Sequence, residues 1–163
     1  MSNKEKTLEK LAALGIPCEV YEHTAAPTME DCLALPYAAP DVTFCKNILL
    51  CNRQMTDFYL LVMPPEKPFR TSVVSKLLGS SRLSFAPNEC LRDMLGLESG
   101  SLSPLALWFD EKKQVKLVID RGVCRPGRIA FHPCDNTATV IFGQDVFRGQ
   151  VLPALERETM WIE

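Results

Sequence analysis

A lysine and an asparagine interrupt an apolar run near the middle of the chain. The stretch FCKNILL, residues 44–50, is rich in strand-forming residues, and Lys46 and Asn47 stand inside it. Because side chains alternate along a strand, Lys46 shares one face with Ile48 while Asn47 points to the other face. A buried ammonium group is costly, so Lys46 must be paired, reach water, or line a pocket that receives an anion or a polar ligand.

A glycine-containing loop is the second candidate for chemistry. In SGSLSP, residues 99–104, Gly100 and Pro104 bracket a tight loop just before an apolar stretch. Glycine allows the backbone to approach a ligand closely and to direct its N–H groups outward, as an oxyanion or phosphate site requires. An ordinary turn explains the same pattern, so this loop alone does not define a site.

The third candidate is the stretch FHPCDNTAT, residues 131–139, which contains one of the two histidines of the chain. His132 could donate or accept a proton near neutral pH, and Asn136 lies in the polar turn that follows it. A structural histidine in a loop is the alternative interpretation.

Other chemistries lack their sequence signatures. Seven cysteines and two histidines occur without a CxxC pair, which argues against a disulfide framework and against a zinc site. There is no phosphate-binding glycine loop followed by Lys-Ser/Thr, and no GxSxG motif. An activated thiolate at Cys45 is disfavoured, because adjacent strand residues such as Cys45 and Lys46 point to opposite faces.

Length and composition predict one globular domain over residues 1–163. The net charge of −2 gives no overall attraction to DNA, RNA or membranes, so any RNA contact must be local. Six Lys/Arg against three acidic residues between positions 110 and 128 could meet phosphates or could simply face water. The start of the chain has no signal-peptide core, and no apolar stretch is long enough for a membrane span, so we expect a cytoplasmic protein.

The order of predicted elements is that of an α+β fold with a curved, mostly antiparallel mixed sheet surrounded by helices. Thr28 is expected to cap a helix, and Thr71 and Asn88 two more. The other expected elements are a first helix after Ser2, a strand at 18–23, hairpins at 42–51/57–63 and 104–109/114–120, strands at 82–86, 128–131 and 137–142, and a closing helix at 144–156.

The three candidate motifs occur in the order found in the YbaK/ProX family of aminoacyl-tRNA deacylases, relatives of the editing domain inserted in bacterial prolyl-tRNA synthetases. CKNILL resembles the family's strand with its Lys-Asn pair, GSLSP its GxxxP loop, and FHPCDNTAT its FHPxxNTAT segment. The opening LAALGIPCEVYEH and the middle GSSRLSFAP also resemble the free-standing ProX branch, so the similarity covers nearly the whole chain.

The resemblance implies hydrolysis of the ester between a wrong amino acid and the 3′ end of a tRNA, without a metal or an organic cofactor. Lys46 would hold the terminal adenosine, Asn47 would support the pocket or its strand, and the amides of Gly100 and Ser101 would hold the developing oxyanion. His132 would line the amino-acid pocket and fix its size. The remaining substrate-binding candidates are Thr28, Pro104 and Asn136.

For the ProX branch the typical substrate is alanine attached to proline tRNA, with the 3′ CCA end and acceptor stem as the contacted parts and prolyl-tRNA synthetase as a further partner. Pro27 stands where that branch has an aromatic residue, and Cys45 replaces a threonine or similar residue. These differences leave open a deacylase of Cys- or Ser-charged tRNA. A separate alternative is a non-catalytic module that keeps the fold and binds an aminoacyl or nucleotide end, although the intact Lys46, Gly100, Pro104 and His132 speak against it.

Overall fold

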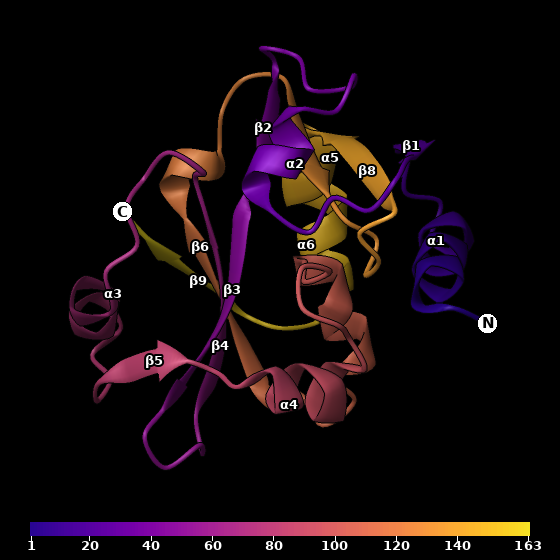
Figure 1. Ribbon diagram of the computed structural model, residues 1–163. Coiled ribbons are helices and arrows are strands. Elements are labelled where there is room, and N and C mark those ends of the chain that lie inside the picture. Colours follow the sequence, from indigo (N-terminus) through magenta and orange to yellow (C-terminus); the bar gives the residue numbers. More distant parts are fainter.

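The strands of the computed structural model, which describes residues 1–163, form two sheets flanked by helices (Figure 1). The four-stranded sheet has the order β1 (Glu19–Glu22), β8 (Ala138–Gly143), β7 (Arg128–Phe131) and β2 (Val42–Phe44). The five-stranded sheet has the order β5 (Leu83–Phe85), β3 (Lys46–Asn52), β4 (Phe58–Met63), β6 (Val115–Asp120) and β9 (Thr159–Ile162). Four of the seven strand pairs are antiparallel and three are parallel, so the α+β class with mixed sheets is confirmed.

The apolar run 42–51, expected as one strand, is divided at Cys45. Residues before it form β2, which pairs parallel with β7, and residues after it form β3, which pairs antiparallel with β4 over six residue pairs. The β3–β4 hairpin is therefore confirmed. The expected alternation also holds within β3, because Leu49 packs into the largest core cluster and Leu50 into a separate cluster on the other face.

The first two helices begin as their capping residues predict. Ser2 caps α1 (Asn3–Ala13), and Thr28 caps α2 (Met29–Leu33) through a capping box with Asp31. The other two caps were wrong by one residue. Thr71 is already the first residue of α3 (Thr71–Leu78), and Asn88 the first residue of α4 (Asn88–Cys90), because Arg70 and Pro87 hold the extended backbone that precedes each helix.

The second predicted hairpin is wrong. Residues 104–109 form a 3₁₀ helix, η2 (Pro104–Phe109), in which Pro104 takes the first position and the Ser103 hydroxyl accepts a hydrogen bond from the Leu105 amide. A short apolar run has no period that separates a strand from a buried helix. Strand β6 instead pairs parallel with β4 and with β9, and β9 was not predicted.

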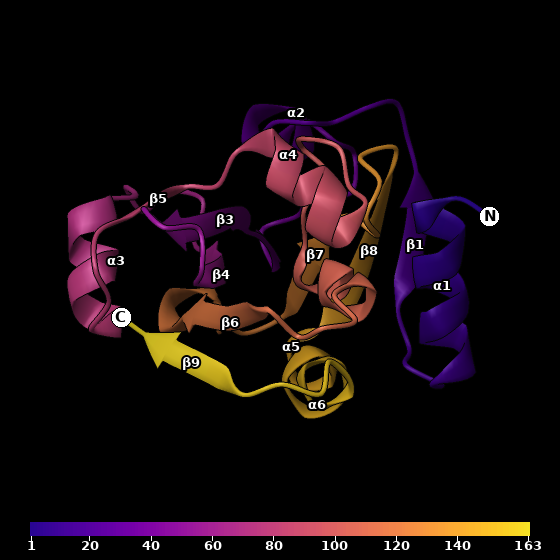
Figure 2. The ribbon, with the colours of Figure 1, turned by 90° about the horizontal axis from the view of Figure 1, so that it is seen from below.

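The expected closing helix is present as three consecutive helical segments: α5 (Gln144–Val146), the π-helical η4 (Phe147–Val151) and α6 (Leu152–Ala154). Two short segments, the π-helical η1 (Leu91–Leu95) after α4 and the 3₁₀ helix η3 (Arg121–Val123) after β6, complete the structure. Helix α1 lies beside β1 and α3 beside β5, at opposite ends of the molecule (Figure 2). No helix combines the length and the apolar character that crossing a membrane requires.

Candidate active site

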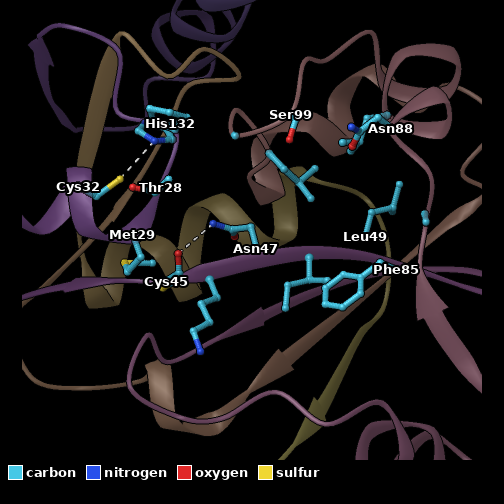
Figure 3. Close-up of a pocket in the computed structure, with 17 residues that line it drawn as sticks. Thr28, Met29, Cys32, Cys45, Asn47, Leu49, Phe85, Asn88, Ser99 and His132 are labelled. Carbon is cyan, nitrogen blue, oxygen red and sulfur yellow. Dashed lines mark hydrogen bonds between the residues drawn. The ribbon is translucent and has the colours of Figure 1, made fainter.

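A cavity of about 380 Å³ opens beside the first residues of β3, and we call it the edge cavity (Figure 3). Its walls come from five segments that lie far apart in the sequence: 27–32, 45–49, 85–91, 99–102 and His132. Among the residues proposed from the sequence, Thr28, Lys46, Asn47, Gly100 and His132 line this cavity. The fold therefore brings the three sequence motifs to one place.

Lys46 and Asn47 lie on opposite sides of β3. The Lys46 ammonium donates a hydrogen bond to the backbone carbonyl of Lys67, at 2.8 Å, whereas Asn47 points to the side on which Figure 3 shows Ser99 and His132. An ammonium has three N–H donors, and this contact uses one of them. Lys46 is thus partly paired by the protein and keeps donors for an anionic or polar ligand.

The side-chain oxygen of Asn47 is buried and has no hydrogen-bond partner. The amide nitrogen of the same side chain donates to the Cys45 carbonyl at 3.3 Å. Leaving a buried acceptor unpaired costs about 1–3 kcal/mol, so such groups are rare in folded proteins and mark sites where a ligand or water supplies the missing donor. Among the sequence candidates that line the edge cavity, Asn47 is therefore the one with a buried side-chain acceptor left unpaired in the free protein.

Gly100 holds the 99–102 loop against the N-terminal side of α2. Its φ is +87°, and a Cβ at this position would lie 2.8 Å from the Cβ of Pro27. Neither the Gly100 amide nor the Leu102 amide has a partner within the chain, whereas the Ser101 amide donates to the Glu98 carbonyl at 3.2 Å. The Ser99 amide is also without a partner, so the unpaired donors on the part of this loop that lines the cavity are those of Ser99, Gly100 and Leu102.

Three of the sequence candidates are not on the wall of the cavity. Ser101 is 5% exposed, Pro104 is buried at the start of η2, and Asn136 is half-buried. The Asn136 carbonyl accepts a hydrogen bond from the Ala26 amide at 2.9 Å, which ties the segment before α2 to the turn after β7. None of these three residues lines the cavity.

His132 is fixed as part of the wall. Its Nδ1 lies 2.9 Å from the Ala138 carbonyl oxygen, and its Nε2 lies 2.9 Å from the Ala26 carbonyl oxygen and 3.4 Å from the Cys32 sulfur. Burial lowers the pKa of His132 below its ordinary value, so the ring is neutral near pH 7 and donates to one of these two carbonyls at a time. These contacts determine the position of the ring and leave it little freedom as a mobile base.

A smaller recess of about 20 Å³ adjoins the edge cavity and shares five of its residues: Met29, Cys32, Cys45, Asn47 and His132. A recess of this volume holds about one water molecule or a group of similar size. Burial raises the pKa of Cys32 to about 11 and raises that of Cys45 further still, so both thiols that border the recess are protonated.

Cys32 and Phe85 are site residues that the sequence motifs did not reveal. Cys32 lies on α2 four residues after Thr28, the N-cap of that helix, and its place in the cavity beside His132 has no local sequence signal. Phe85 comes from the end of β5 and gives no local signal. Pro27 and Cys45, noted as departures from the ProX pattern, both line the cavity.

Comparison with known proteins identifies the class to which this fold and site belong. The model of the aminoacyl-tRNA editing domain matches residues 23–148, so the chain belongs to that family. The segment includes Lys46, Asn47, Gly100 and His132, which supports the relationship inferred from the motifs.

Two curated relatives cover most of the chain. The prolyl-tRNA editing protein ProX of Acetoanaerobium sticklandii is 29% identical over 145 residues, which are 89% of this chain and 88% of the relative. The prolyl-tRNA synthetase associated domain-containing protein 1 of Bos taurus is 30% identical over 137 residues, 81% and 78% of the two chains. The solved structure of the hypothetical protein APE2540 has the same fold, with a TM-score of 0.74 at 17% identity over 95% of this chain and 97% of its own.

Proposed function

We propose that this protein is a trans-editing deacylase that hydrolyses the ester of alanine wrongly attached to proline tRNA. The observation that carries the proposal is the small recess beside the edge cavity, bordered by Asn47, Cys32 and His132. Its volume of about 20 Å³ suits a methyl side chain and is too small for a proline ring. The name of the Acetoanaerobium sticklandii relative, which refers to prolyl-tRNA editing, supports the same substrate class.

The size selection complements that of a synthetase. A synthetase pocket shaped for proline cannot exclude a smaller side chain sterically, because each missing methylene costs only about 1–3 kcal/mol of binding. A second site that admits only the small side chain supplies the missing discrimination. In this protein the fixed His132 ring and the Cys32 side chain set the limit of that second site.

In the reaction, water attacks the ester carbonyl carbon, and the bond from that carbon to the ribose oxygen of the terminal adenosine breaks. The amino acid is released, and the ribose oxygen takes up a proton to become a hydroxyl. The free amides of Gly100 and Leu102 are the donors that would stabilise the developing oxyanion. Lys46 would hold the nucleotide end, and Asn47 Oδ1 would accept a hydrogen bond from the substrate or from a bound water. Neither Cys32 nor Cys45 acts as a nucleophile, because burial keeps both thiols protonated.

The partner is accordingly a mischarged tRNA, bound through its 3′ CCA end and the adjoining acceptor stem. Contacts limited to this part of the RNA require few basic residues, in keeping with the net charge of −2. Prolyl-tRNA synthetase, which would release the mischarged tRNA, is the second partner in this proposal.

The test is release of amino acid from Ala-tRNA(Pro), Cys-tRNA(Pro), Ser-tRNA(Pro) and correctly charged Pro-tRNA(Pro). Wild type should deacylate the alanyl ester selectively, and Lys46→Ala should reduce kcat/KM by about 100-fold. Lys76→Ala, which removes an exposed lysine in the last turn of α3, is the matched control and should retain full activity. Preference for the cysteinyl or seryl ester would replace the alanine assignment, and survival of every ester would refute deacylation.

A further inference from the structure

Phe85 is an exposed aromatic side chain at the rim of the edge cavity. It is 61% exposed, and every other phenylalanine, tyrosine or tryptophan in the chain is buried or half-buried. The ring nevertheless lines the edge cavity. A single exposed apolar side chain is common on protein surfaces, so the exposure of Phe85 matters only because this aromatic ring lies beside the candidate site, where it can contact a ligand.

The ring lies on the Lys46 side of β3. In the antiparallel pairing of β5 with β3, Phe85 stands opposite Leu50, and Leu50, Ile48 and Lys46 follow one another on that face. Figure 3 shows the Phe85 ring on the opposite side of β3 from Asn47 and Ser99. We call the surface formed by Lys46, Ile48 and Phe85 the ledge.

Two features keep the ledge open and its ring oriented. Strand β5 is at the edge of its sheet, so no further strand covers Phe85. Phe69 contacts the ring in a T-shaped arrangement, with centroids 5.2 Å apart and an interplanar angle of 63°, which favours one orientation of the ring while most of the side chain stays exposed.

We propose that the ledge binds the unpaired 3′ end of the tRNA, with one base stacked on Phe85 and a phosphate near Lys46. The inference rests on the proposed function and extends it to a residue that contacts the nucleotides. It follows from continuity: one cavity is lined both by Asn47, Gly100 and His132, from one side of β3, and by the ledge residues, from the other side. An aminoacyl group held on the first side leaves its nucleotides to run along the second.

The chemistry of the ledge matches that occupant. Exposed aromatic rings bind unpaired bases by stacking, without reading their sequence, and a nearby cation binds the backbone. Ile48 adds an apolar surface next to the ring, and Lys46 retains ammonium donors beyond its contact with the Lys67 carbonyl.

Steady-state kinetics on Ala-tRNA(Pro) provide the first test. Phe85→Ala should raise KM at least about fivefold, equal to about 1 kcal/mol at 1.4 kcal/mol per factor of ten, and should change kcat less than about twofold. Phe85→Tyr should restore the wild-type KM, whereas Phe85→Leu, which is apolar but cannot stack, should not. Leu77→Ala, at a 50% exposed position on α3, is the matched control and should leave KM unchanged. An unchanged KM in Phe85→Ala, or full rescue by leucine, would overturn the stacking assignment.

Binding of uncharged RNA provides a test that does not depend on hydrolysis. The probe is an acceptor-stem minihelix that ends in single-stranded CCA, compared with the same minihelix lacking those three nucleotides. Wild type should bind the intact RNA at least about fivefold more tightly than Phe85→Ala does, and both proteins should bind the truncated RNA equally. Equal affinity of wild type and Phe85→Ala for the intact RNA would refute binding of the 3′ end at the ledge. If wild type binds the intact minihelix more tightly than Phe85→Ala does but hydrolyses no ester, the proposed function is wrong while binding of the 3′ end at the ledge is supported.

Discussion

The structure contains two cavities of nearly equal volume whose polar groups are arranged in opposite ways. The edge cavity measures about 380 Å³, and a rear cavity of about 370 Å³ lies between α3, residues 67–70 and the strands β4, β6 and β9. In the rear cavity the buried charge is already paired: the Lys67 ammonium lies 2.5 Å from the Asp120 carboxylate, which also accepts a hydrogen bond from the Gly122 amide. In the edge cavity the Asn47 side-chain oxygen and the Gly100 amide have no partner.

This difference shows that volume alone does not mark a functional site in this protein. Both cavities could hold a ligand of similar size, yet one of them presents unpaired hydrogen-bonding groups whose partners a substrate can supply. Changes in the edge cavity should therefore reduce activity with little effect on stability, and changes in the rear cavity should do the reverse.

The largest effect is expected from Gly100→Ala. The added Cβ would lie 2.8 Å from the Pro27 Cβ, so the loop that carries the free amides must move. Deacylation should fall about 100-fold, the cost of a displaced oxyanion donor. Gly79→Ala is the matched control, because it also has a positive φ, +64°, but meets no atom within 4 Å. Both variants should lose about 1 kcal/mol of stability from backbone strain, measured by urea unfolding, and equal activities would contradict the role of the loop.

A smaller effect, on stability and not on activity, is expected from Lys67→Met in the rear cavity. This change leaves the Asp120 carboxylate, which is 3% exposed, without its charged partner. Because Lys67 itself is 41% exposed and screened by water, the loss of stability should be about 1–2 kcal/mol. Deacylation should remain within about twofold of wild type, since Lys46 contacts the backbone and not the side chain of Lys67. A large loss of activity without a loss of stability would contradict the assignment of activity to the edge cavity and of stability to the rear cavity.

The smallest effect is a pH dependence of stability that comes from His132. Burial lowers its pKa below the ordinary 6.5, with Asp135 and His23 as the charged or titratable neighbours. Below pH 6.5 the unfolded chain therefore binds a proton that the folded protein does not bind. The neutral, buried His132 therefore contributes fully to the free energy of unfolding above pH 6.5. This contribution decreases as the pH falls through 6.5 toward the lower pKa that His132 has in the folded protein. His132→Gln should flatten the unfolding free energy between about pH 7 and pH 5, measured by urea unfolding at a series of pH values.

Only some of the residues proposed from the sequence line the edge cavity, and their roles stay predictions. Those that line it are Thr28, Lys46, Asn47, Gly100 and His132. Ser101, Pro104 and Asn136 belong to the same sequence motifs but do not line it, because proximity in a loop does not determine which residue faces a cavity.

The errors in the fold have a similar origin. Residues 104–109 were expected as a strand because a short apolar run suits a strand and a buried helix equally well. Strand β9 was missed because its partner β6 lies about 40 residues away, and the chain between them gives no local signal of parallel pairing. Phe85 was missed for the same reason, since its place at the cavity depends on the pairing of β5 with β3.

The pairing of β3 with β4 has a consequence for how the site can adapt to its ligands. Lys46 and Asn47 are joined by a single peptide bond, and six residue pairs hold their strand in register. A slip of one residue would exchange the two sides, so the separation between the ledge and the amino-acid recess is invariant unless the sheet is broken. Changes in the size of the accepted amino acid must then come from the other walls, α2 and the 99–102 loop, which meet where Pro27 touches Gly100.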